Sequence, residues 1–482
     1  MKNFLAAVGF TCVVGVVVYA QARPANWPTF GGDAQRSGWE RADARITKDS
    51  VKDLQLLWKM KLENQPKGPR PLLPPLILGN LISYRGFKEL AFVASSSDIV
   101  YAIDADLGKT FWTKHLEYAS LEPPVTGSSA TCPGGLTATP TMPPPAAPGR
   151  GGAPVARGPA PAAGAAPAPP PVPARGPFAA FGAASVYTIS SDGRLHKLNT
   201  STGDDQVQPV KVLPSNASIS SLNIADNVIY ATTSHECNGA PNAVWAVDLV
   251  PDPPKPASFA MSGTDSIGIG GPVLGTDGTV YVQTTERLLA LGPRDLKLKQ
   301  SFSLTSNSAS PLVITYKEQE LVVTAGKDGR LNLLDSSLKP LHQTSAIGPE
   351  VWGGLSTWLE MDGTRWILAP VWGPSNSGSI AAFKVEEQGG KPVLTSAWVS
   401  RDMPSPQPPV IANGVVFALS SGKAGGHATL YALDAATGKE LYSSRNLVTA
   451  PAALTGMTVA NGRVYFGTTD GTAYEFGIYM EH

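Results

Sequence analysis

The sequence predicts an all-β fold, an eight-bladed β-propeller of four-stranded antiparallel blades whose ring is closed by the N-terminal strand. Three observations lead to this prediction. A β-rich unit recurs along most of the chain, no helical periodicity separates its copies, and glycine (49) and proline (44) together form about 19% of the 482 residues. Both residues break helix interiors, which excludes a protein built of long helices.

The charge balance excludes one class of partner. The chain has 38 basic and 38 acidic residues, a formal net charge of zero, and no strong basic run. A protein that binds nucleic acid needs a cationic surface for phosphate contacts, so we expect no nucleic-acid partner. The hydrophobic content of 42% argues against general disorder.

The N-terminus is typical of an export signal. A short positive start is followed by an apolar run at 4–19 and by Ala-Gln-Ala at 20–22, which fits a small-x-small cleavage site. The apolar run is shorter than the roughly 20 residues that a spanning helix needs. We therefore expect residues 1–22 to be removed, and 23–482 to form one exported domain, periplasmic or secreted, with no membrane span.

The repeat becomes visible when the central strand of each unit is aligned. The aligned positions are Phe92, Tyr187, Tyr230, Tyr281, Val323, Leu368, Phe417 and Tyr465. All steps but the first are about 42–51 residues, which is the length of a four-stranded blade. Asp-Gly pairs at 192–193, 328–329 and 470–471 lie between β-rich runs and predict tight hairpin turns.

The first step of the repeat, 95 residues, contains an insertion. Residues 133–184 hold about 15 of the 44 prolines and only three charged residues, and they are rich in alanine and glycine. Such a composition buries too little apolar surface to offset the entropy of ordering. We expect a disordered, partly polyproline II loop, and the alternative is a docking segment for a partner that recognises proline.

Ring closure is also predicted from the sequence. Residues 54–60 resemble a strand, yet no repeat unit precedes them, and the last unit ends soon after 474–479. The simplest arrangement has the N-terminal strand complete the last blade. Such closure leaves no open sheet edge where the two ends of the ring meet.

Two segments carry a family resemblance. Residues 102–112 closely resemble the tryptophan-docking repeat of quinoprotein (PQQ-dependent) alcohol dehydrogenase-like propellers, and 432–442 is a second copy with tyrosine in the tryptophan position. The N-terminal residues 27–38 are similar to the beginning of proteins in the same superfamily. The proposed structural positions, with the acidic residue and glycine in a tight turn and the aromatic residue between blades, are Asp104, Gly108, Trp112, Asp434, Gly438 and Tyr442.

The resemblance implies a cofactor that can be tested against the residues. A PQQ dehydrogenase needs an aromatic floor for the quinone, oxygen ligands for calcium and a general-base aspartate. Trp352 and Trp372 are the weak candidates for cofactor contacts, in a segment that also holds Trp358 and Trp366. The alternative is that these tryptophans pack between blades. No adjacent cysteine pair and no catalytic base can be identified, and Asn376 is displaced from the expected metal-ligand position.

The cysteines and histidines predict no metal site. The six histidines are scattered, and no Gly-x-Ser-x-Gly, His-Glu-x-x-His or phosphate-loop motif is present. After removal of residues 1–22 two cysteines remain, Cys132 and Cys237. In an oxidising compartment they can form a disulfide, but the sequence leaves open whether they are close enough.

Two functions remain from the sequence. The first is an exported propeller that acts as a binding or scaffold platform, for a protein or small-molecule ligand, without intact PQQ chemistry. Peptides would be captured at exposed strand edges or loops. The second is a PQQ-dependent oxidoreductase that acts on an alcohol or sugar, with PQQ and calcium as cofactors.

Overall fold

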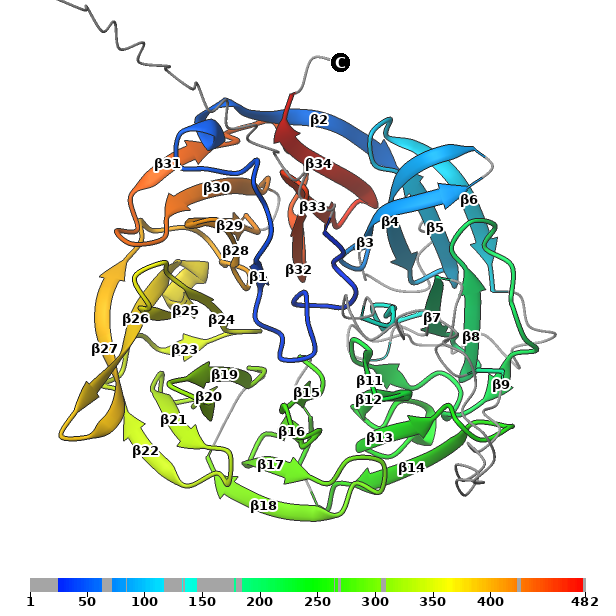
Figure 1. The fold of residues 1–482 in the computed structure, drawn as a ribbon, viewed down its shortest axis with the longest axis horizontal. Helices are drawn as coiled ribbons and strands as arrows, with labels where there is room; N and C mark the ends of the chain where they lie inside the picture. The colour runs from blue at the N-terminus through cyan, green and yellow to red at the C-terminus, as the bar shows by residue number, and fades with distance from the viewer. Residues whose placement is uncertain are drawn as a thin grey trace, which may run out of the picture.

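Eight β-sheets form a closed ring around a central axis in the computed structural model (Figure 1). The structure describes residues 25–62, 72–83, 85–116, 132, 135–144, 177–178, 184–263, 265–267, 270–304, 309–422 and 426–479. In these ranges the helices are three short 3-10 turns, η1 (Ser50–Asp53), η2 (Cys237–Gly239) and η3 (Pro374–Asn376). The predicted all-β, eight-bladed fold is confirmed.

Blades are numbered along the chain from the first complete sheet. Blade 1 contains β3 (Leu76–Ser83), β4 (Gly86–Ser95), β5 (Ile99–Asp104) and β6 (Lys109–His115). Blade 2 contains β7 (Ser185–Ile189), β8 (Arg194–Asn199) and β9 (Val210–Lys211). Blade 3 contains β10 (Ser218–Ile219), β11 (Asn223–Ala225), β12 (Val228–Ser234), β13 (Ala243–Asp248) and β14 (Lys255–Ala260). Blade 4 contains β15 (Val273–Leu274), β16 (Val280–Gln283), β17 (Arg287–Leu291) and β18 (Leu298–Ser303).

The second half of the ring continues in chain order. Blade 5 contains β19 (Leu312–Tyr316), β20 (Gln319–Ala325), β21 (Leu331–Asp335) and β22 (Pro340–Gln343). Blade 6 contains β23 (Glu350–Val351), β24 (Ser356–Leu359), β25 (Arg365–Trp372), β26 (Gly378–Gln388) and β27 (Lys391–Val399). Blade 7 contains β1 (Trp39–Glu40), β28 (Val410–Ala412), β29 (Val415–Ser420), β30 (Thr429–Asp434) and β31 (Glu440–Ser443). Blade 8 contains β2 (Leu54–Lys61), β32 (Ala452–Ala460), β33 (Arg463–Thr468) and β34 (Thr472–Ile478).

The aligned repeat positions occupy one place in the architecture. Each is buried in a strand close to the inner side of its blade, in β4, β7, β12, β16, β20, β25, β29 and β33. Strands next to them pair in antiparallel register, as between β4 and β5. The period of the sequence therefore corresponds to one blade per unit.

The ring closes as predicted. β2, from the N-terminal part of the chain, pairs antiparallel with β34 and forms the outer strand of blade 8. β1 adds in parallel to β28 on the inner side of blade 7. Separation of blade 8 from its neighbours would thus require the N-terminal strands to unpair from the last two blades.

Three tryptophans join neighbouring blades through one repeated contact. Trp58 in β2, Trp112 in β6 and Trp398 in β27 lie on outer strands. Their Nε1 groups donate to backbone carbonyls in the turn of the next blade, at Ala105 (2.9 Å), Thr200 (2.9 Å) and Ala435 (3.0 Å). Each acceptor immediately follows the first residue of the predicted turn. The tryptophan contact is therefore made between blades and not within one.

The predicted turn residues lie under these rings. Gly108 N and Gly438 N donate to the carbonyls of Asp104 and Asp434, at 2.9 and 2.8 Å. Both glycines have positive φ, 59° and 71°. A Cβ at Gly108 would lie 2.5 Å from Trp58, and one at Gly438 would lie 2.4 Å from Trp398. Glycine thus serves both the backbone conformation and the close approach of the ring.

Tyr442, in the tryptophan position of the second copy, lies on β31 of blade 7. It is half-buried and packs against a hydrophobic cluster that extends into blade 8. Burial raises the pKa of its phenol. The tyrosine therefore also contributes to packing between blades.

The predicted insertion includes part of a blade. Within 133–184 the structure describes 135–144, 177–178 and 184, and the rest lies outside the described residues. Thr141 pairs with Tyr187 as the innermost segment of blade 2, and Leu136, Met142 and Phe178 are buried. At least these residues belong to the core, because apolar burial orders them. The predicted signal at 1–22 also lies outside the described residues, whose helices include none long and apolar enough to span a membrane.

Candidate functional site

A cavity of about 280 Å³ lies near the ring axis. Seven blades contribute to it through their innermost segments, and we call it the axial cavity. Its lining residues are Phe30, Leu73, Pro74, Thr137, Thr139, Ser218, Ile219, Ser220, Ser221, Ser234, Gly270, Trp352, Gly353, Pro408, Leu454 and Thr455. The described lining is apolar or carries hydroxyl groups, and it includes no Asp, Glu, Lys, Arg or His.

Residues 25–40, the N-terminal segment, cross the centre of the ring beside the cavity (Figure 1). Backbone hydrogen bonds connect Trp27 to Ile77 of blade 1 and Gly38 to Ile411 of blade 7. Further bonds reach blades 2, 3, 4, 6 and 8. The segment supplies Phe30 to the cavity wall and holds the inner ends of the blades together.

Arg36 anchors the N-terminal segment through hydrogen bonds, and it forms no ion pair with an acidic side chain of the described residues. Its Nε, Nη1 and Nη2 donate to the backbone carbonyls of Pro272 (3.0 Å), Phe30 (2.9 Å) and Ser221 (2.9 Å). The side chain is buried, and burial lowers its pKa against the opposing charge of Asp33. Arg36 lines a second cavity of about 20 Å³, which shares Phe30 with the axial cavity.

The two predicted cofactor residues contact each other. Trp352 and Trp372 are stacked with ring centroids 4.7 Å apart and an interplanar angle of 14°. Trp372 Nε1 donates to Pro406 O at 2.8 Å, and only Trp352 lines the axial cavity. One of the two weak candidates therefore lines the cavity, and the other stacks against it.

The remaining tryptophans of that segment pack in the core. Trp358 and Trp366 are buried and stacked, with ring centroids 6.3 Å apart. Both belong to the hydrophobic cluster shared by blades 6 and 7. For this pair, packing between blades is the arrangement that the structure shows.

The described lining does not fit calcium-bound PQQ. PQQ is a planar tricarboxylate, and its burial requires cationic partners or metal ligands for its charges. The cavity walls offer hydroxyl groups and one indole face, and no group of three or more acidic, histidine or cysteine side chains that could hold a metal ion occurs in the described ranges. No reaction step through PQQ is derived for these residues.

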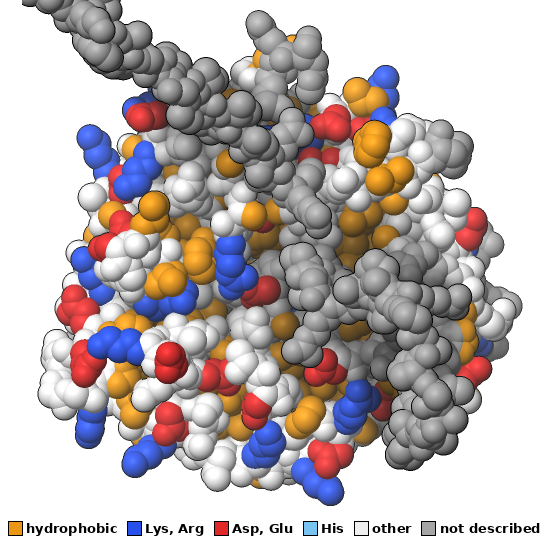
Figure 2. Space-filling model, in the orientation of Figure 1, with side chains coloured by type: hydrophobic (Ala, Val, Ile, Leu, Met, Phe, Trp, Pro, Cys, Tyr) orange, Lys and Arg blue, Asp and Glu red, His pale blue; other side chains and the backbone are white. Residues whose placement is uncertain are grey.

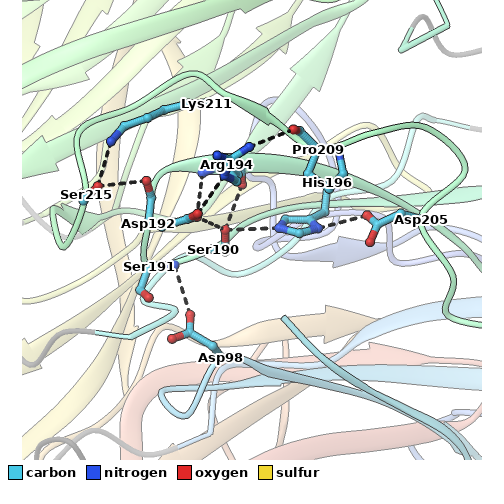
Figure 3. Close-up of polar contacts among 10 residues, drawn as sticks. All are labelled: Asp98, Ser190, Ser191, Asp192, Arg194, His196, Asp205, Pro209, Lys211 and Ser215. Atoms are coloured by element: carbon cyan, nitrogen blue, oxygen red, sulfur yellow. Dashed lines mark hydrogen bonds and ion pairs between the residues drawn. The ribbon is translucent and has the colours of Figure 1, made fainter. Parts of the chain in front are cut away.

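A Ser–His–Asp arrangement occurs in blade 2 (Figure 3). His196 Nδ1 lies 2.9 Å from Asp205 Oδ1, and His196 Nε2 lies 3.1 Å from Ser190 Oγ. The Ser190 hydroxyl is fully buried and donates to Asp192 Oδ1 at 2.6 Å. A nucleophile must reach a substrate, so burial argues against catalysis by Ser190.

The internal repeat explains the same serine as a turn residue. In blade 8 Thr468 occupies the corresponding position, with its Oγ1 2.5 Å from Asp470 Oδ1 and 3.0 Å from Thr472 O. Ser190 makes the equivalent contacts to Asp192 and to Arg194 O. The serine therefore closes the Asp-Gly hairpin, and His196 packs beneath it.

A cluster of charges lies where blade 8 meets blade 1. Arg463 pairs with Asp106 at 2.5 Å, and its guanidinium lies 3.5 Å from Glu475 and 3.7 Å from Glu89. Tyr465 donates to Glu89 at 3.2 Å. Burial raises the pKa of Glu475 well above its ordinary range and also raises that of Glu89, against the lowering effect of Arg463. We call these five residues the seam cluster.

The two cysteines are joined. Cys132 and Cys237 form a disulfide with an S–S distance of 2.06 Å and a Cα–Cα distance of 5.4 Å. It connects the chain just before the inner segment of blade 2 to η2 in blade 3. The disulfide lies at one end of the predicted insertion.

Several important residues were not identified from the sequence. Trp58 and Trp398 were not assigned to docking, although each lies three strands before the Asp-x-x-x-Gly element that it contacts. The burial of Arg36 and the hydroxyl groups of the cavity carry no distinctive local motif. Their partners come from distant blades, so no short pattern could have revealed them.

Comparisons with known proteins agree with the geometry. The family model described as outer membrane protein assembly factor BamB matches residues 376–478. No protein in the search of curated proteins matches. Structurally, the chain is similar to a quinohemoprotein alcohol dehydrogenase from Comamonas testosteroni, with a TM-score of 0.59 and 16% identity over 96% of this chain and 82% of that one.

Other solved structures are similar over most of this chain. A quinohemoprotein alcohol dehydrogenase from Pseudomonas putida has a TM-score of 0.59 and 12% identity, over 95% of this chain and 80% of that one. A europium-containing methanol dehydrogenase has a TM-score of 0.56 and 12% identity, over 94% and 98%. At such identities the similarity establishes the fold.

Proposed function

Since the chain is a PQQ-like β-propeller, we propose that it acts after export as a binding platform without PQQ chemistry. The observation that carries the proposal is the axial cavity, whose described lining has no charged side chain. A quinoprotein of this type would need groups there to hold a tricarboxylate and a calcium ion. A ligand or partner would bind at the cavity mouth or at the loops around it.

The surface is compatible with a platform. On the face shown in Figure 2, side chains of both signs are spread over the rim and no large area of one sign is visible. A surface with both signs of charge supports solubility but discriminates little between charged partners. Binding specificity would therefore depend on the shape of the surface and on the axial cavity.

The test uses the purified protein with PQQ and calcium. We expect no saturable binding and no dye reduction with a panel of alcohols and sugars. Stoichiometric PQQ binding with turnover, both lost in Trp352→Ala, would establish an oxidoreductase in place of the platform. Tyr479→Ala, at an exposed site outside the cavity, is the matched aromatic control.

The oxidoreductase remains the second candidate because of Trp352. Its half-buried ring lies in the axial cavity and is supported by Trp372, as a stacking floor would be. The PQQ titration separates the two functions directly, since only one of them needs the cofactor.

Export is part of the proposal. The signal-like residues 1–22 and the disulfide between Cys132 and Cys237 support an oxidising destination. We expect protein isolated outside the cytoplasm to begin near residue 23 and to show no alkylated cysteine before reduction. Intact residues 1–22 with two alkylated thiols would contradict export.

A further inference from the structure

The axial cavity has two walls of different chemistry. Blades 2 and 3 contribute a group of hydroxyl side chains, whereas blade 6 contributes the indole of Trp352. In Figure 1 blade 2 (β7–β9) and blade 6 (β23–β27) lie on opposite sides of the ring. A ligand between them would meet an aromatic face on one side and hydrogen-bonding groups on the other.

Two of the hydroxyl groups retain a proton to donate. Ser220 Oγ accepts from Thr232 N at 3.0 Å and from Thr232 Oγ1 at 2.8 Å. Thr139 Oγ1 accepts from Ser221 Oγ at 3.2 Å. A hydroxyl that accepts hydrogen bonds still carries one donor proton. Ser220 and Thr139 can therefore each donate to an oxygen or nitrogen atom of a ligand.

The nearby cation, Arg36, is outside the described lining of the axial cavity. Three of its five N–H groups donate to backbone carbonyls. A carboxylate that entered the cavity would lose its hydration without gaining an ionic partner from the described walls. The cavity therefore discriminates against negative charge.

We propose that the axial cavity binds a small uncharged ligand with a planar aromatic ring and a carbonyl or ether acceptor. The aromatic ring of the ligand stacks on Trp352, whose orientation is fixed by stacking against Trp372. The carbonyl or ether oxygen of the ligand accepts a hydrogen bond from Ser220 or Thr139. This inference rests on the proposed platform function and gives the chemical class of its ligand. The apolar part of the lining, including Leu73, Ile219 and Leu454, provides most of the contact surface.

The experiment compares two probes that differ in charge. 2-Acetylnaphthalene is an uncharged ketone, and 2-naphthoate is a carboxylate of nearly the same shape. Calorimetric titration of the full chain at neutral pH is expected to give at least about tenfold tighter binding of the ketone. Trp352→Ala should weaken ketone binding by about tenfold or more, because it removes the stacking surface.

A charge-gain variant keeps the test independent of Trp352. Leu454 lies at the cavity and is 44% exposed, while Leu447 is 46% exposed and is outside the lining. Leu454→Lys should raise the affinity for 2-naphthoate by about tenfold, since an ammonium then meets the carboxylate. Leu447→Lys should leave both affinities unchanged.

Each outcome either supports or contradicts the inference. Selective ketone binding that depends on Trp352, with 2-naphthoate admitted only by Leu454→Lys, supports the inference. Absence of ketone binding, equal affinity for both probes, or the same effect from Leu447→Lys overturns it. If neither the ketone nor PQQ binds, the inference about the ligand is wrong but the platform function is retained. Stoichiometric PQQ binding would instead contradict the platform function itself.

Discussion

Arg36 near the ring axis and Arg463 at the seam between blades 8 and 1 are both largely removed from water, but they are neutralised differently. Arg36 donates to three backbone carbonyls, whereas Arg463 lies among Asp106, Glu89 and Glu475. Burial lowers the pKa of Arg36, and the carboxylates around Arg463 favour its charged form. Arg36 is therefore stabilised by the dipoles of backbone carbonyls, whereas Arg463 is stabilised by the carboxylates of the seam cluster.

This difference indicates separate tasks for the two regions. Hydrogen bonds to carbonyls depend on direction, so Arg36 fixes the path of the N-terminal segment beside a cavity whose described lining has no charged side chain. Ionic contacts depend mainly on charge and distance, so the seam cluster joins the last blade to the first.

The largest expected effect comes from Arg463→Met. It would leave Glu89 and Glu475 without their counter-charge, and loss of one member of a buried ionic group costs about 3–5 kcal/mol. We expect urea unfolding at pH 7 to show this loss, and the loss should decrease in acid as the carboxylates become protonated. Arg445→Met, at an exposed site, should change the free energy of unfolding little; equal losses would contradict the role of the seam.

Lysine substitutions sharpen the contrast between the two arginines. Arg36→Lys keeps the charge, but one ammonium cannot replace the three nitrogens, and unpaired carbonyls should cost about 1–3 kcal/mol. Arg463→Lys should retain more of the wild-type stability, because charge is the main requirement there. Thermal unfolding of both variants provides the measurement, and the opposite ranking would reverse our assignment of dipolar and ionic roles.

Gly108→Ala tests the docking of Trp58 at the same seam. A Cβ there would lie 2.5 Å from the indole, in addition to the strain of positive φ, and we expect a loss of about 1–3 kcal/mol. Gly86→Ala is the matched control, since Gly86 also has positive φ and its Cβ would meet nothing within 4 Å. Similar losses in denaturant titrations would show that backbone strain alone accounts for the effect.

The smallest effect expected is a change in pH dependence. The pKa of Glu475 is raised in the folded protein, so the folded state holds more protons than the unfolded state above the ordinary pKa of glutamate. This group therefore makes stability fall as pH rises above the ordinary pKa of glutamate. Glu475→Gln should make the melting temperature depend less on pH above the ordinary pKa of glutamate. If the pH dependence of the melting temperature is the same in Glu475→Gln as in the wild type, Glu475 is not its source.

Local sequence chemistry predicted much of the fold. Asp-Gly pairs specify tight hairpins because glycine tolerates positive φ, and the recurring β-rich unit sets the number of blades. The strand-like segment at 54–60, which has no preceding unit, predicted closure of the ring. These features depend on residues within one unit, so a sequence pattern can contain them.

The candidate site was predicted only in part. Trp352 was identified as a candidate for ligand contacts and lines the axial cavity, while Trp372 lies behind it. Residues 133–184 were predicted from composition to form a disordered insertion, but some of them, such as Met142, belong to the core. Composition could not show that part of this alanine- and proline-containing segment is buried.

The sequence by itself therefore determined the repeat, the hairpins and the closing strand, and the tertiary structure decided what meets at the axis and at the seam. The axial cavity combines segments from seven blades, and Glu89 and Arg463 are separated by most of the chain. The different surroundings of Arg36 at the axis and Arg463 at the seam come from contacts between distant parts of the chain. Closure brings together residues whose desolvation depends on neighbours far away in the sequence.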